Sequence, residues 1–129
     1  MSDTFEFKGD PVAKPRMTRA DQWKKRPIAE KYWAFKDEIK KQAKEQGFQI
    51  GETYRVEFHV GMPKSWSKKK KREMVGQPHK QTPDVDNFLK SLNDCLLDDD
   101  SAVWYVVAVK KWAEKSSIKV ENFPNDLDF

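Results

Sequence analysis

The plainest pattern in the chain is a strict alternation of apolar and polar residues from Tyr54 to Val60. Tyr54, Val56, Phe58 and Val60 would face a core, and the residues between them are polar. A period of two residues is typical of a strand with one buried face. The alternation therefore predicts a half-buried strand over residues 54–60.

The stretch from Ile28 to Gln46 has a longer period. Its apolar residues recur every three or four positions, which places them on one face of a helix. They are Ile28, Tyr32, Phe35, Ile39 and Ala43. Pro27 suits a first helical turn and Gly47 the position just past the last one. We therefore expect a helix over residues 28–46.

Shorter patterns predict the other elements. Alternation predicts strands over residues 4–8 and 117–121, and helical periodicity predicts a second helix over residues 85–97. Residues 102–110 form a run that is apolar on both faces. Such a run predicts a strand that is either central in the sheet or covered by a partner.

Two segments rich in proline and basic residues, about 10–27 and 63–81, are expected to be irregular and mobile. Within the second segment, Ser67 could cap a short helix that ends by Met74. The order of elements is β-α-β-loop-α-β-β, without regular βαβ alternation. This order predicts an α+β fold, in which two main helices pack on one face of a small mixed sheet.

Composition narrows the class of protein. The 129 residues are 37% hydrophobic and 36% charged, yet five Trp and eight Phe are too many for a disordered chain. We expect one domain, residues 1–129, with a poorly ordered tail over residues 122–129. No apolar run approaches the roughly 18 residues of a membrane span, and the start does not resemble a signal peptide. One cysteine excludes an internal disulfide, so the cytoplasm is the simplest compartment.

The basic residues are concentrated. The net charge of +4 and the pI near 9.1 suit nucleic acid or an anionic membrane surface. Residues 64–80 carry seven Lys or Arg and one Glu. They could bind DNA phosphates while Trp66 stacks on a base, although a solubilising loop is the plainer interpretation. The candidate DNA-binding residues are Lys14, Arg16, Arg19, Lys64, Trp66, Lys68, Lys69, Lys70, Lys71, Arg72 and Lys80.

An acidic cluster follows directly, with six aspartates and one lysine from Asp84 to Asp100. Asp84 and Asp86 lie where the helix over residues 85–97 should begin, and residues 98–100 lie beyond its end. An antiparallel return or a second chain could bring the two groups together. Carboxylates without a His or Cys cluster suit a hard cation, Mg²⁺ or Mn²⁺. Such a metal can activate water for phosphodiester hydrolysis.

The same residues have a plainer interpretation. Asp84 could cap the helix, and Asp86 could complement the helix dipole and pair with Lys90 one turn later. In the catalytic interpretation, Lys90 would stabilise the charge of the transition state, and Asp94 would extend the same polar stripe. Capping accounts for one or two acids, but not for six beside a basic segment. Both interpretations stay open on the residues alone.

Three lone residues are expected to have ordinary positions. We expect His59 on the exposed side of its strand, His79 in a loop, and Cys95 as a filler on the apolar face of its helix.

A family resemblance is carried by the run P-D-V-D-N-F-L-K-S-L-N-D, which is followed by D-D-S-A-V. It resembles the RusA-type Holliday-junction resolvases of bacteria and their phages. The segments F-K-G-D-P-V-A-K-P-R and F-H-V-G-M-P-K-S-W-S-K-K-K-K-R are also similar to that family, the latter to its phage members. The likeness covers most of residues 4–121, and the D-x-D-N-x-x-K-x-x-x-D core is specific.

The resemblance implies a Mg²⁺-dependent endonuclease for which Mn²⁺ would substitute. Its catalytic and metal-binding carboxylates would be Asp84, Asp86 and Asp100, and its essential lysine Lys90. The spacer before the acidic pair is shorter than in the family, and the run of three aspartates leaves Asp99 or Asp98 as alternates for Asp100. Supporting roles would fall to Asn87, Asp94 and Asp99.

The resemblance also implies a homodimer that resolves four-way junctions by paired symmetric nicks in DNA recombination and repair. Two coordinated cuts need two sites, and one chain of this size is too small to hold both. The strand over residues 102–109, with Trp104 and Tyr105, could supply the interface. The expected partners are branched DNA and a second copy, with no membrane, in a bacterial or phage-infected cell. A nuclease acting on flaps or forks, and a non-catalytic DNA-binding module, remain alternatives.

Overall fold

A four-stranded mixed sheet forms the centre of the protein in a computed structural model that describes residues 3–15 and 27–124. The strands lie in the order β1-β4-β2-β3. β2 and β3 are parallel, whereas β4 runs antiparallel to both β1 and β2. The strands are β1 (Thr4–Lys8), β2 (Thr53–Gly61), β3 (Tyr105–Ala113) and β4 (Ser117–Asn122). The predicted α+β class with a mixed sheet is confirmed.

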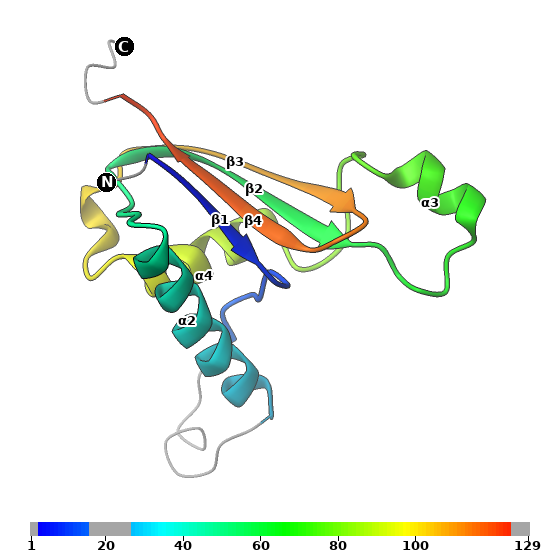
Figure 1. Cartoon of the computed structure of the whole chain (residues 1–129), viewed down its shortest axis with the longest axis horizontal. Helices are drawn as coiled ribbons and strands as arrows, with labels where there is room; N and C mark the ends of the chain where they lie inside the picture. Colours follow the sequence, from blue (N-terminus) through cyan, green and yellow to red (C-terminus); the bar gives the residue numbers. More distant parts are fainter. Residues whose placement is uncertain (1–2, 16–26, 125–129) are drawn as a thin grey trace.

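Two long helices cover one face of this sheet, as predicted (Figure 1). α2 spans Pro27–Glu45 and α4 spans Val85–Leu96. A short helix, α3 (Lys68–Met74), projects from the end of the sheet where β2 and β3 finish. Ser67 caps α3 by accepting a hydrogen bond from the Lys70 amide at 3.1 Å, as the sequence predicted.

The core lies between the sheet and the two long helices. Alternate residues of β2, among them Tyr54, Val56 and Phe58, are almost completely buried. The apolar face of α2 packs on them through Ile39 and its neighbours, and α4 adds Leu92. The periodicities of the sequence therefore identified most of the buried residues, but Ile28 is 53% exposed and Val60 is only half-buried. Cys95 fills the core as expected, and burial raises the pKa of its thiol to about 11.

The strand predicted over residues 102–110 begins later than expected. Asp100–Ala102 forms a short 3-10 helix, so β3 begins at Tyr105. β3 is an edge strand, so the prediction of a central strand was wrong, and the alternative of a strand covered by a partner stays a prediction. The local cause is Asp99, whose side chain accepts a hydrogen bond from the Ser101 amide at 3.0 Å and stabilises a turn where the apolar run predicted a strand.

Residues 76–79 pair with the second half of β3 on the outer edge of this strand. The amide of His79 donates to the Lys110 carbonyl at 3.0 Å, and Gly76 donates to the Trp112 carbonyl at 2.8 Å. His79 is therefore buried, and burial is the main cause that lowers its pKa. His79 lies outside the helices and strands, as predicted, but its burial was not predicted because this pairing is non-local. His59, expected to be exposed, is half-buried and lies 3.2 Å from Glu57.

The C-terminal residues that the structure describes are attached to the sheet. Phe123 donates its amide to the Thr53 carbonyl at 3.1 Å, and its ring lies 5.5 Å from that of Tyr105. The rest of the predicted tail, residues 125–129, lies outside the described residues. In the described part of the chain, no helix is both long and apolar enough to cross a membrane.

Candidate active site

The N-terminus of α4 presents the two predicted carboxylates Asp84 and Asp86. Asp84 is the N-cap residue, but its side chain makes no capping hydrogen bond. Its backbone carbonyl accepts the first helical hydrogen bonds, from the amides of Asn87 and Phe88 at 3.1 and 3.2 Å. Both carboxylates are exposed. The capping interpretation therefore does not account for the Asp84 carboxylate, whose oxygens remain available to a ligand.

Lys90 follows one turn after Asp86 on the same face of α4. Its Nζ lies 4.0 Å from Oδ2 of Asp86, and the two side chains are 69% and 68% exposed. An exposed pair at this distance is weak and leaves both groups able to reorient. The ion pair therefore does not prevent Asp86 from binding a cation or Lys90 from binding a phosphate. Asn87, on the next position of the turn, is half-buried.

The second acidic group lies beyond the other end of α4. The helix spans 12 residues, so its two ends are about 18 Å apart. Asp98, Asp99 and Asp100 are all exposed there. Among residues 3–15 and 27–124, no three His, Cys, Asp or Glu side chains gather closely enough to hold a metal ion. One chain thus keeps Asp100 away from Asp84 and Asp86.

The three consecutive aspartates are not equivalent. Asp99 already accepts a hydrogen bond from the Ser101 amide, and this bond holds the pKa of its carboxyl below the usual value. Asp100 carries no such capping role, and its negative charge adds to the effect of burial in raising the pKa of Tyr54. Tyr54 itself donates a hydrogen bond to Asn93 on α4. Of Asp99 and Asp100, these contacts leave Asp100 the better candidate for an external ligand.

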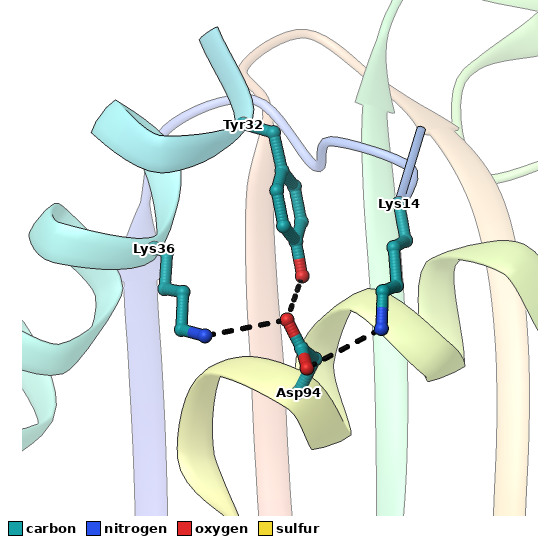
Figure 2. Close-up of polar contacts among 4 residues, drawn as sticks. All are labelled: Lys14, Tyr32, Lys36 and Asp94. Atoms are coloured by element: carbon teal, nitrogen blue, oxygen red, sulfur yellow. Dashed lines mark hydrogen bonds and ion pairs between the residues drawn. The ribbon is translucent and has the colours of Figure 1, made fainter. Parts of the chain in front are cut away.

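The spacing of Asp94 predicted a place in the polar stripe of Asp86 and Lys90, but its side chain contacts other residues (Figure 2). It accepts a hydrogen bond from the Tyr32 hydroxyl of α2. Nζ of Lys14 lies 3.4 Å from one of its oxygens, and Nζ of Lys36 lies 3.4 Å from the other. Burial opposes ionisation of Asp94, but these partners outweigh it and hold its pKa below the usual value. Asp94 therefore joins α2, α4 and the N-terminal segment instead of extending the stripe of Asp86 and Lys90.

The basic residues of the predicted DNA-binding set divide into three groups. Lys68–Arg72 lie on α3, which projects from the sheet, and Lys64 and Lys80 are exposed on either side of it. Lys14 is engaged with Asp94. Arg16 and Arg19 lie outside the described residues.

Trp66 is packed within the protein at the base of α3. Its ring centre lies 4.8 Å from that of Trp112, and Nζ of Lys70 lies 4.3 Å from the Trp66 ring. Trp112 also contacts His79, with ring centres 4.3 Å apart. This aromatic cluster anchors α3 to β3. Stacking of a base on Trp66 stays a prediction and would require Lys70 to move.

Lys110 is a residue that the sequence reasoning missed. It lies on the core-facing side of β3 and donates hydrogen bonds to the carbonyls of Gln81 and Pro83, just before Asp84. A lysine that interrupts an apolar run at a core-facing position is a signal that could have identified it, because a partly buried ammonium needs specific acceptors.

Comparison with known families decides the class of the protein. A model of the family described as "Endodeoxyribonuclease RusA" matches residues 8–121. The chain belongs to the RusA endodeoxyribonuclease family. No match was found among curated proteins.

The RusA match includes every structural feature of the candidate site. It contains Lys14, α3, both ends of α4 and the whole of β3. Membership makes the protein an endodeoxyribonuclease of the Holliday-junction resolvase type, which binds branched DNA. The resemblance drawn from the sequence is thereby confirmed. RusA-type resolvases are generally metal-dependent nucleases, and the exposed carboxylates of Asp84 and Asp86 provide hard oxygen donors suited to such a metal.

Proposed function

We propose that this RusA-type nuclease resolves four-way DNA junctions by paired, symmetric, Mg²⁺-dependent nicks in recombination and repair. The observation that carries the proposal is the pair Asp84 and Asp86, exposed at the N-terminus of α4 without a capping bond from the Asp84 side chain. The Asp84 carboxylate does not cap its helix and Asp86 is only weakly paired with Lys90, so both carboxylates can bind an external cation. The protein would act on DNA in the cytoplasm of a bacterial or phage-infected cell.

The donor set suits Mg²⁺, with Mn²⁺ as a substitute. Mg²⁺ keeps several waters and needs only a few carboxylate oxygens, which Asp84, Asp86 and Asp100 would supply. When bound, the metal would activate a water and neutralise charge on the scissile phosphate. Lys90 lies one turn from Asp86 and is exposed, so its ammonium can approach the same phosphate and stabilise the additional negative charge of the transition state.

A second copy of the chain would complete the site. Within one chain, Asp84 and Asp86 lie at the start of α4 and Asp100 lies beyond its other end, and the helix between them is about 18 Å long. Two copies related by a two-fold axis could place Asp100 of one beside the pair of the other, and would do so twice. Such a dimer contains two identical sites, as two symmetric nicks require.

The edge strand β3 is the surface best suited to this dimer. Within the described chain, no strand pairs with the outer edge of residues 106–109. The face of the sheet opposite α2 and α4 carries Val107 and Val109 on β3, and no described helix covers it (Figure 1). Trp104, just before β3, is 59% exposed. An unpaired edge beside an exposed tryptophan and two half-buried valines favours association with another chain.

Recognition of the junction would depend on shape and charge. α3 carries five consecutive basic residues, Lys68–Arg72, on a lobe that projects from the sheet. Basic side chains on such a lobe can follow the phosphates of a branched duplex without reading bases. Asp94 and its partners would support the site by holding α2 and the N-terminal segment against α4.

The proposal is tested by cleavage of a labelled immobile four-way junction, a flap and a linear duplex, each with and without Mg²⁺. We expect paired cuts at symmetric positions in two junction strands, only with metal, and little cleavage of the other substrates. Efficient cleavage of the flap with unpaired cuts in the junction would contradict junction resolution and favour a general branched-DNA nuclease.

A further inference from the structure

Lys110 occupies an unusual place for a charged residue. Four residues of β3 face the helices, because they lie beside the core-facing residues of β2 in the sheet register, and Lys110 is the charged one among them. It lies beside Phe58, which is 1% exposed. A partly buried ammonium is costly unless its donors are satisfied. Its contacts therefore indicate what this lysine does.

Those contacts all converge on the segment that leads into Asp84. The Lys110 ammonium donates to the carbonyl of Gln81 and, at 2.7 Å, to the carbonyl of Pro83. Its own backbone carbonyl accepts from the His79 amide at 3.0 Å. One residue thus binds the segment over residues 79–83 at three points. The last of these points is the carbonyl directly before Asp84.

We propose that Lys110 is a positioning residue that fixes the start of α4, and with it the carboxylates of Asp84 and Asp86, for metal binding. This inference rests on the proposed function, because it assigns Lys110 to the site of those two carboxylates. Without the ammonium, two backbone carbonyls beside Asp84 lose their donor. Groups that orient metal ligands in this way typically contribute 10–100-fold to metal affinity.

The neighbouring lysine provides a matched control. Lys111 faces the opposite side of the sheet, where its Nζ lies 3.5 Å from Glu57. It has the same charge and lies on the same strand. Its backbone forms a β-bridge with Pro78, but its side chain pairs with Glu57 and not with residues 79–83. Lys110→Met and Lys111→Met therefore make the same chemical change and the same change in net charge. Lys110→Arg retains a charged donor at the tested position.

Two readouts test the inference without relying on cleavage. The first is the affinity for Mn²⁺ of the full-length protein without DNA, measured by electron paramagnetic resonance. The second is hydrogen–deuterium exchange in residues 79–86. We expect Lys110→Met to weaken Mn²⁺ binding by about tenfold or more and to speed exchange in this segment. Lys110→Arg should restore much of both, and Lys111→Met should change neither.

A folded Lys110→Met protein with wild-type Mn²⁺ affinity and wild-type exchange would overturn the inference. If Lys110→Met does not fold, Lys110→Ala, which also removes the donor, is measured by the same two readouts, and wild-type values of both would overturn the inference. Failure of the proposed function looks different, since the wild-type protein would then bind no Mn²⁺. The exchange measurement would still show whether Lys110 holds the segment before Asp84.

Discussion

The hydroxyl of Tyr32 on α2 donates a hydrogen bond to the carboxylate of Asp94 on α4 (Figure 2). Lys14 and Lys36 approach the same carboxylate, so three parts of the chain meet at one acidic side chain. The contact closes the two-helix layer that covers the sheet. Asp94 is therefore engaged away from the exposed pair Asp86 and Lys90, although the three residues are spaced four apart in the sequence.

Removal of the Asp94 charge should destabilise the protein. We expect Asp94→Asn to lower the free energy of unfolding by about 1–2 kcal/mol, since it weakens a charged hydrogen bond and two partly exposed ion pairs. Tyr32→Phe, which removes only the hydroxyl, should cost less. Urea unfolding followed by tryptophan fluorescence measures both. Equal stability of Asp94→Asn and wild type would show that the cluster does not hold the helices together.

The difference in the free energy of unfolding between wild type and Asp94→Asn should depend on pH. Burial opposes ionisation of Asp94, but the bond from Tyr32 and the charges of Lys14 and Lys36 lower its pKa in the folded protein. A lowered carboxyl pKa stabilises the fold above the unfolded-state value near 4, and this contribution is lost as pH falls through the folded-state pKa. The stability difference from Asp94→Asn should therefore be constant between about pH 7 and pH 5 and shrink below about pH 4. A difference that grows on acidification would contradict this assignment.

The basic lobe should determine the salt dependence of DNA binding. Each phosphate contact contributes about 0.9 to the slope of log affinity against log salt concentration on duplex DNA. We expect the double variant Lys68→Glu/Lys69→Glu on α3 to bind a junction more weakly and with a slope smaller by about 1–2. The variant Lys41→Glu/Lys44→Glu, on exposed positions of α2, makes the same charge change as a control. An unchanged slope in the α3 variant would remove this lobe from the DNA-binding surface.

Much of the fold could be predicted because its signals are local. The alternation at Tyr54 and its neighbours and the periodicity of residues 28–46 each report a buried face directly. The position of β3 could not be predicted this way, because an apolar run does not reveal which strands lie beside it. Its late start depends on Asp99, whose short side chain stabilises a turn that competes with the strand.

The candidate site was also predicted only where its sequence signals are local. Asp84, Asp86 and Lys90 were predicted from spacing within one helix. The structure places Asp84 and Asp86 at its start and Lys90 one turn after Asp86, and their role in catalysis stays a prediction. Contacts between residues far apart in the sequence could not be predicted from these patterns. Spacing related Asp94 to Lys90, whereas its actual partners come from α2 and the N-terminal segment. Lys110 was missed for the same reason.

The shared site can be tested by mixing two inactive variants. In a dimer formed from one Asp86→Asn chain and one Asp100→Asn chain, the first chain retains Asp100 and the second retains Asp86. If each site combines residues of two chains, one of the two sites is intact and the mixture should nick one strand of the junction. If each site lies within one chain, both sites carry a substitution and no activity should return.

The control for this experiment is each variant alone, which should be inactive at the same total concentration. Light scattering should give the mass of a dimer for the mixture and for both variants. A mixture that forms dimers but stays inactive would contradict a site made from two chains, while leaving metal-dependent cleavage itself unaffected.

The most direct test of the central claim is junction cleavage by Asp86→Asn in the presence of Mg²⁺. The carboxylate of Asp86 is exposed and bonded only weakly to Lys90, so its loss should leave the fold intact. Asp37→Asn makes the same change at an exposed position of α2. We predict that Asp86→Asn loses nicking by about two orders of magnitude or more while it binds the junction in EDTA as wild type does. Wild-type rates of nicking by Asp86→Asn would contradict the assignment of the active site.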